Sequence, residues 1–309
     1  MKKRKHKNSP TSEEAVPIPD DEIGACRTSL FISLCLRSQA VSSNGLKVKK
    51  KDKKSRKATV DSDTIEPHKA KKEKRRRDHI DAVSPSTTTS EAQAYLKKHG
   101  VSIHPTPDTP SLFPITSFDD LPIPDRLLSA FSTFNEPTPV QACAWPPALA
   151  GRDVVGIAET GSGKTLAFGI PALARLLSSS SAEKGPRALV LAPTRELALQ
   201  THDALSALKA VPCAVAFGGV DKSQQARSIK GAQVVVGTPG RILDLIGDGG
   251  LVLAAVEYLV LDEADRMLDK GFENDIRAII GHAKQGAARQ TLMCKCVAWL
   301  WCYLLIEVR

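Results

Sequence analysis

Val154–Ser178 reads VVGIAETGSGKTLAFGIPALARLLS, and the rest of the chain is best understood outward from it. Val154–Ile157 is a short apolar run, typical of a strand buried on both faces. The glycine-rich loop Ala158–Thr165 follows, and a helical apolar pattern begins at Lys164. A strand, a glycine-rich loop and a helix in this order present backbone N–H groups to phosphate oxygens. The sequence therefore predicts a phosphate-binding loop, although Ala158 stands where the general pattern has glycine.

The residues of this loop have separate predicted tasks. Lys164 supplies a positive charge for the β- and γ-phosphates of a nucleotide, and the hydroxyl of Thr165 suits Mg²⁺. The backbone N–H groups of the loop hold the phosphates. The candidate nucleotide-binding residues are Ala158, Glu159, Thr160, Gly161, Ser162, Gly163, Lys164 and Thr165.

A second motif, VLDEAD at Val260–Asp265, places two adjacent carboxylates after an apolar strand. In enzymes with a phosphate-binding loop, the acid at such a strand end holds Mg²⁺. Asp262 is the candidate for this role, and Glu263 is the candidate that activates or orients the attacking water. The alternative is an exposed acidic turn that opens an ordinary helix.

Short apolar runs alternate with helical patterns over the rest of the chain. The expected strands are Val154–Ile157, Ala188–Ala192, Cys213–Phe217, Val234–Gly237 and Tyr258–Leu261. The expected helices are Lys164–Leu177, Glu196–Lys209, Gln224–Ile229, Arg241–Ile246 and Glu273–His282, with a short one at Tyr95–Val101. Alternation of this kind predicts an α/β fold, a parallel sheet with helices on both faces. Ligands then bind at the carboxyl ends of the strands, where both motifs lie.

The motifs together resemble the first domain of the DEAD-box RNA helicases. Asp262–Asp265 is the sequence that names that family, and five further motifs stand in the family's order. These are FNEPTPVQ (Phe134–Gln141), AETGSGKT, PTRELA (Pro193–Ala198), Gly218–Gly219 and TPGR (Thr238–Arg241). The resemblance covers about residues 115–293. It implies a RecA-like fold and an ATP-dependent RNA helicase that uses ATP and Mg²⁺.

By this resemblance, Lys164, Asp262 and Glu263 are the catalytic residues, and Thr165 and Asp262 hold the metal. Gln141 reads adenine, as the amide geometry of glutamine allows. Phe118 stacks on the base, or is simply a core phenylalanine next to a linker. The RNA backbone is held by Thr194, Arg195, Gly219, Thr238 and Arg241. For Arg195 and Arg241 the alternative is an ion pair at a helix start.

Charge divides the chain into two parts. Residues 1–100 hold 24 Lys/Arg against 13 Asp/Glu, whereas residues 101–309 hold 19 against 21. Three basic clusters lie at Lys2–Lys7, Lys47–Lys57 and Lys69–Arg77. Such runs do not build a core, and they indicate a disordered tail. The tail is expected to serve nuclear import and nonspecific RNA contact; the alternative is a tail that is only solvated and soluble. With Ala144–Pro146 (AWP), the tail resembles the nucleolar, ribosome-assembly branch of the family, which implies pre-ribosomal RNA as partner.

Several classes of protein are excluded by composition. No apolar run reaches 18 residues, so a membrane-spanning helix and a membrane partner are not expected. Acidic residues precede the first apolar stretch, which argues against a secretory signal. The seven cysteines are odd in number and lack paired CxxC spacing, so a reducing compartment is expected. Residues 24–46 differ in character from their charged flanks and are assigned no role.

The family pattern stops after Met293. A Ser-Ala-Thr motif is expected there, but the chain reads CKCVAWLWCYLLIEVR, which exposes an apolar surface or covers a sheet edge. The expected organisation is a tail at 1–90, a linker at 91–117, the helicase domain at 118–293 and an aberrant segment at 294–309. Without second-domain arginines this chain is expected not to unwind RNA. The alternative is a truncated, noncatalytic isoform that binds RNA or a partner; a metabolic kinase is disfavoured by the family motifs.

Overall fold

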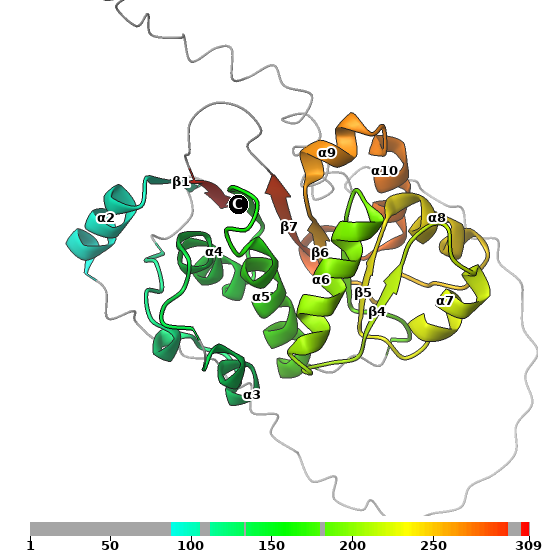
Figure 1. Cartoon of the computed structure of the whole chain (residues 1–309), viewed down its shortest axis with the longest axis horizontal. Helices are drawn as coiled ribbons and strands as arrows, with labels where there is room; N and C mark the ends of the chain where they lie inside the picture. The colour runs from blue at the N-terminus through cyan, green and yellow to red at the C-terminus, as the bar shows by residue number, and fades with distance from the viewer. Residues whose placement is uncertain (1–87, 106–111, 133, 180–182, 296–303, 309) are drawn as a thin grey trace, which may run out of the picture.

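The computed structural model describes residues 88–105, 112–132, 134–179, 183–295 and 304–308, the last of these as backbone alone (Figure 1). Within these residues, one eight-stranded sheet has the order β1-β8-β2-β7-β6-β3-β5-β4. The three basic clusters, residues 24–46 and residues 296–303 lie outside the described residues, so the expectations for them remain predictions.

Six neighbouring strands of this sheet run parallel, which confirms the predicted α/β architecture. They are β2 (Val154–Ile157), β3 (Ala188–Leu191), β4 (Cys213–Ala216), β5 (Val234–Gly237), β6 (Tyr258–Leu261) and β7 (Gln290–Lys295). Most of their residues are buried, because helices cover both faces of a parallel sheet. Strand β7 continues two residues past Met293, so the family-like strand extends into the segment that the sequence analysis assigned to an aberrant tail.

Alternate side chains of the strands enter two separate cores, one on each face of the sheet. Val190 and Val260 face the first core, whereas Leu191 and Leu261 face the second. The first core lies under α4 (Pro139–Leu149), α5 (Lys164–Ser178) and α6 (Arg195–Ala207). The second lies under α7 (Lys222–Ile229), α8 (Pro239–Gly247), α9 (Ala264–Asp269) and α10 (Glu273–His282). Figure 1 shows the two groups of helices on opposite sides of the strands.

The segment before the first core differs from the expected linker. Helix α2 spans Thr89–Lys98 rather than Tyr95–Val101, and β1 (Val101–Pro105) follows it. The helix begins early because Thr88 forms a capping box with Glu91. The helix is finished before Val101, which opens the strand.

Two strands of distant sequence complete the edge of the sheet beside β2. Strand β8 (Leu304–Val308) pairs antiparallel with β2 and parallel with β1. The C-terminal segment therefore covers a sheet edge, which was one of the two outcomes expected for it. Short helices η3 (Phe118–Asp120), α3 (Asp125–Leu128) and η4 (Ser129–Phe131) lead into α4, and η5 (Gly286–Ala288) precedes β7.

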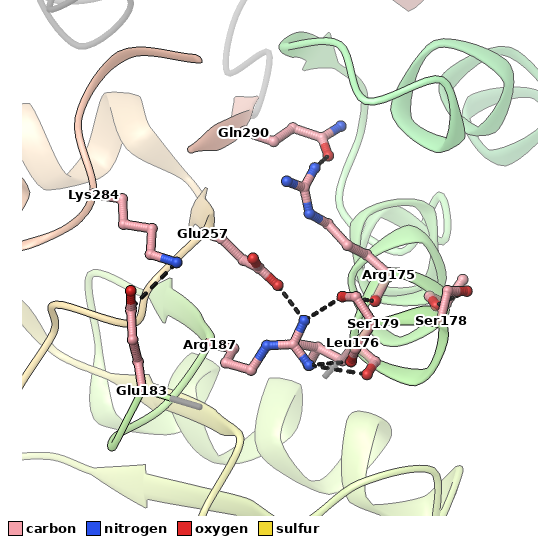
Figure 2. Close-up of polar contacts among 10 residues, drawn as sticks. Arg175, Leu176, Ser178, Ser179, Glu183, Arg187, Glu257, Lys284 and Gln290 are labelled. Atoms are coloured by element: carbon pink, nitrogen blue, oxygen red, sulfur yellow. Dashed lines mark hydrogen bonds and ion pairs between the residues drawn. The ribbon is translucent and has the colours of Figure 1, made fainter. Parts of the chain in front are cut away.

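A buried polar network fixes the amino ends of the strands (Figure 2). The guanidinium of Arg187, at the start of β3, pairs with Glu257 and donates to the carbonyl oxygens of Leu176 at 3.0 Å and Ser179 at 2.7 Å. Gln290 is the first residue of β7, and its side chain donates to one carbonyl oxygen in the last turn of α4 and to one in the segment between α4 and β2. Buried charges are tolerated when they are paired and hydrogen-bonded, and the Glu257 carboxylate and the carbonyl oxygens provide such partners for the Nη atoms of Arg187. No helix in the described ranges is long and apolar enough to cross a membrane.

Candidate nucleotide and RNA site

The predicted site residues gather at the carboxyl ends of the parallel strands. The phosphate-binding loop follows β2, and the Asp262–Glu263 pair follows β6. Thr194 follows β3, Gly219 follows β4 and Thr238 follows β5. The strand order therefore places the nucleotide motifs over one half of the sheet edge and the proposed RNA motifs over the other.

The phosphate-binding loop closes around its own lysine. Lys164 Nζ donates to the carbonyl oxygen of Ala158 at 2.7 Å and of Glu159 at 2.5 Å, and the residue is only 8% exposed. Gly163 has φ 92°, which L side chains rarely adopt, and it opens α5. The loop therefore has the shape and the cation that a polyphosphate needs.

Gln141 connects the N-terminus of α4 to this loop. Its Oε1 accepts from the backbone N–H of Thr138 at 3.1 Å, and its Nε2 donates to the carbonyl oxygen of Gly163 at 3.1 Å. A primary amide carries two N–H groups and two lone pairs on oxygen. These two bonds leave one N–H and one oxygen lone pair of Gln141 unused, and its contact with adenine remains a prediction.

Phe118 has a packing role in this structure. Its ring stacks on Phe131, with centroids 4.5 Å apart and 14° between the planes, and lies 6.1 Å from Trp145. Trp145 is fully buried and donates from Nε1 to the carbonyl oxygen of Leu166 in α5 at 3.2 Å. The core alternative therefore describes Phe118 here, and its contact with the base remains a prediction.

The two carboxylates after β6 have different surroundings. Asp262 is 3% exposed, and burial, followed by the charge of Glu263, raises its pKa to about 6, while Lys164 opposes the shift. Lys164 and Asp262 therefore lie close enough for their charges to interact. Glu263 adopts left-handed backbone angles, φ 48° and ψ 51°, and its Oε2 accepts from Arg266 Nη1 at 3.0 Å. Backbone strain of this kind concentrates at functional sites.

The donor set fits the Mg²⁺ that the family implies. Mg²⁺ in nucleotide sites takes one or two carboxylates, with substrate phosphates and water completing its octahedron. Asp262 provides a buried carboxylate beside the loop that carries Thr165. The described part of the chain has no group of three or more His, Cys, Asp or Glu side chains that could hold a metal ion.

The loops after β3, β4 and β5, which carry the candidate RNA motifs, offer hydroxyl, backbone and guanidinium donors. Thr194 caps α6, and its Oγ1 accepts from the N–H of Leu197 at 3.2 Å, so its hydroxyl proton is left for a ligand. The hydroxyl of Thr238 makes no capping bond at the start of α8. Arg195 is exposed, and Gly219 is exposed with φ 85°. Such groups suit contacts to a sugar-phosphate backbone, which carry no base information.

Arg241 is placed differently from Arg195. Its Nη1 donates to Gln225 Oε1 at 2.6 Å and to the carbonyl oxygen of Val220 at 3.0 Å, and its side chain is 10% exposed. In this structure Arg241 holds the Gly219 loop against α7. Both internal bonds are made by Nη1, and the direct contact of Arg241 with RNA remains a prediction.

Three residues that support the candidate site could not be identified from the sequence. Gln225 holds Arg241, Phe217 lies under Arg195, and Lys270 donates to the carbonyl oxygen of Pro193 at 3.3 Å. Each acts across elements that are far apart in the sequence. Only the position of Phe217, directly before the glycine pair, was a local signal that could have drawn attention to it.

Replacing Gly163 by alanine is expected to destabilise the protein by about 1–3 kcal/mol and to weaken nucleotide binding. The added Cβ would lie 2.6 Å from Gln141 Nε2, and the residue would keep an unfavourable φ of 92°. Thermal unfolding and a fluorescent-nucleotide titration measure both effects. Gly161→Ala is the matched control, because φ there is 81° but no atom lies within 4 Å of the new Cβ. Equal effects of the two substitutions would rule out the contact with Gln141 as the cause.

Residues 138–295, just over half of the chain, match the family model described as DEAD/DEAH box helicase. The chain therefore belongs to the DEAD/DEAH box helicase family, as its motifs indicated. A crystal structure of a DEAD box protein from Methanococcus jannaschii has a similar fold, with a TM-score of 0.55 and 33% identity, over 63% of this chain and 57% of that one.

Two fungal proteins are closely similar in sequence. ATP-dependent RNA helicase dbp3 of Schizosaccharomyces pombe is 53% identical over 207 residues, which are 64% of this chain and 35% of the relative. ATP-dependent RNA helicase DBP3 of Cryptococcus neoformans is 52% identical over 231 residues, which are 68% and 36%. The chain thus spans little more than a third of the length of these curated relatives.

Proposed function

We propose that this chain is the ATP- and RNA-binding first domain of an ATP-dependent RNA helicase. The proposal rests on one observation: at the carboxyl ends of the strands, the nucleotide motifs and the candidate RNA motifs follow different strands of the sheet. The nucleotide motifs follow β2 and β6, and the candidate RNA motifs follow β3, β5 and β4. The names of the fungal relatives, ATP-dependent RNA helicases, support the same activity.

In this proposal each residue has a physical task at ATP. Lys164 leaves the carbonyl oxygens of Ala158 and Glu159 and binds phosphate oxygens instead. Thr165 and Asp262 would hold Mg²⁺, which would neutralise charge on the phosphates. Glu263, fixed by its strained backbone and by Arg266, orients the attacking water and accepts its proton. Binding of this kind accelerates the reaction only where it strengthens in the transition state.

Nucleotide choice tests the assignment of Gln141. We expect the unmutated chain to prefer ATP to GTP, because the free N–H and lone pair of the amide match the N7 and N6 edge of adenine. Gln141→Ala should lower ATP affinity roughly tenfold, the value of one or two neutral hydrogen bonds, and narrow the ATP/GTP difference. Competition with a fluorescent ATP analogue measures both.

Gln141→Glu is the matched variant for this test. Its carboxylate still accepts from the N–H of Thr138 but cannot donate to Gly163 or to adenine. It should therefore lose the preference for ATP while keeping the cap of α4. Equal ATP and GTP affinities in the unmutated protein would rule out adenine recognition by Gln141.

We further propose that a polypeptide of these 309 residues alone binds ATP without RNA-stimulated turnover or unwinding. Arginines that stabilise charge on the γ-phosphate are worth roughly 10³–10⁵ in rate in related enzymes, and the family motifs that carry them are not in this sequence. The measurement is phosphate release with and without RNA, beside Glu263→Gln. RNA-stimulated release that Lys164→Ala abolishes would refute this proposal. The same chain would then be a working enzyme rather than a noncatalytic binding module.

The setting of the activity is also a proposal. The basic clusters of residues 1–90 support nuclear import and long-range attraction to RNA. Together with the AWP sequence of Ala144–Pro146, they support a nucleolar location and a role on pre-ribosomal RNA.

A further inference from the structure

The loop that joins β3 to α6, Pro193–Arg195, is held from both sides. On the β6 side, Lys270 at the end of α9 donates from Nζ to the carbonyl oxygen of Pro193 at 3.3 Å. On the β4 side, the ring of Phe217 lies under the guanidinium of Arg195, with Cζ 4.7 Å from the ring centroid. Lys270 comes from the segment after β6, which pairs with β3, whereas Phe217 follows β4, which is separated from β3 by β5.

The contact between Arg195 and Phe217 fixes the arginine without using its hydrogen-bond donors. Phe217 is only 6% exposed, so its ring is a fixed platform, whereas Arg195 itself is exposed. A cation–π contact draws on the charge of the guanidinium and requires none of its N–H groups as hydrogen-bond donors. Among the residues that the structure describes, no hydrogen bond or ion pair to the Arg195 guanidinium is found, so these donors remain available.

Arg241 differs from Arg195 in its contacts and in its exposure. Both arginines lie at the carboxyl ends of the strands, yet Arg241 donates from Nη1 to Gln225 and to the carbonyl oxygen of Val220, and its side chain is only 10% exposed. Arg195 is therefore the exposed arginine of the two, and the ring of Phe217 lies under it. A phosphate oxygen of a nucleic-acid backbone is the ligand that a presented guanidinium fork binds best.

We propose that Phe217 is a positioning residue for RNA binding: its ring holds Arg195 ready for a backbone phosphate. The inference rests on the proposed RNA function of this edge. Without the ring, Arg195 must be ordered at the moment of binding, which costs affinity. A cation–π contact at an exposed site corresponds to about a two- to fivefold change in affinity.

The test is a double-mutant cycle in the full chain, with a short unstructured oligoribonucleotide as probe. Arg195→Ala should weaken binding and flatten the dependence of log affinity on log salt by about 0.7, the value of one single-strand phosphate. Phe217→Leu should weaken binding about two- to fivefold, and Phe217→Tyr, which keeps the ring, should restore it. The double variant Phe217→Leu/Arg195→Ala should bind no more weakly than Arg195→Ala alone. The basic tail contributes equally to every variant, so the differences report this edge.

Two outcomes would overturn the inference in different ways. If Phe217→Leu weakens binding additively with Arg195→Ala, or Phe217→Tyr fails to rescue it, the ring acts otherwise than through Arg195, while the RNA function of the edge stands. If Arg195→Ala leaves affinity and salt dependence unchanged, Arg195 is not an RNA contact, and the proposed RNA function of this loop fails with it. Ring-current shifts of the Arg195 side-chain protons provide an independent readout. They should be present in the unmutated chain and with Phe217→Tyr, and lost with Phe217→Leu even if that variant is less stable.

Discussion

Replacing Lys164 by alanine is expected to lower the affinity for Mg·ATP roughly 10- to 100-fold. Lys164 is the buried cation of the phosphate-binding loop, and its ammonium is held by the carbonyl oxygens of Ala158 and Glu159. On binding, it exchanges these partners for phosphate oxygens. A hydrogen bond to a charged group is worth about 1.5–3 kcal/mol, which corresponds to the expected loss.

The measurement is a fluorescent-nucleotide titration with Mg²⁺ present. Lys284→Ala is the control, because that lysine lies near the opposite edge of the sheet and pairs with Glu183 at 3.2 Å. It removes the same charge from the protein and should leave ATP affinity unchanged. Equal losses from the two substitutions would show that net charge, and not the loop, determines binding.

Replacing Asp262 by asparagine is expected to stabilise the nucleotide-free protein by about 1–3 kcal/mol while removing Mg²⁺-dependent ATP binding. Burial raises the pKa of this carboxyl group from 3.8 to about 6, so the folded state disfavours its charge. A shift of about two pKa units corresponds to at most about 3 kcal/mol at neutral pH. Asparagine has nearly the same shape without the charge, at the cost of the metal ligand.

The pH dependence follows from the direction of this shift. Because the pKa of Asp262 is higher in the folded than in the unfolded state, the free energy of unfolding of the unmutated protein falls as pH rises from about 4 to above about 6. The Asp262→Asn variant has no carboxyl group at this position, so this decrease is absent from it. The two proteins should therefore be similarly stable below about pH 4 and differ most at neutral pH. Chemical unfolding at several pH values measures the difference, with the exposed Asp269→Asn as control; a variant less stable than the unmutated protein at pH 7 would contradict the expectation.

Much of the fold could be predicted because each element has a local cause. Helix α10 was predicted at its observed bounds from its helical apolar pattern, and the strands from β2 to β6 were predicted within one residue from their short, nearly continuous apolar runs. Helix α2 was predicted with the wrong bounds, because the local capping box of Thr88 and Glu91 was overlooked, and strand β1 was not predicted, because it depends on a partner that is distant in sequence. Strand β1 pairs with β8, which lies about 200 residues further along the chain.

The candidate site also has features that could be predicted from the sequence and features that could not. The phosphate-binding loop and the Asp262–Glu263 turn are contiguous motifs, so their residues and their meeting at one sheet edge were predictable. Which of the two arginines is exposed was not predictable. Arg195 and Arg241 have the same side chain and comparable motifs, and only the tertiary contacts with Phe217 and Gln225 separate them. Likewise, the bond from Gln141 to Gly163 requires α4 to pack against the loop.

The central claim is that one sheet edge holds two separable sites, for ATP over β2 and β6 and for RNA over β3, β5 and β4. The most direct test measures both ATP and single-stranded RNA affinity for Lys164→Ala and Arg195→Ala in the full chain. Lys164→Ala should lose ATP and keep RNA, whereas Arg195→Ala should lose RNA affinity and keep ATP. If each substitution weakens both ligands equally, or if neither separates them, the edge is not divided in this way and the account is wrong.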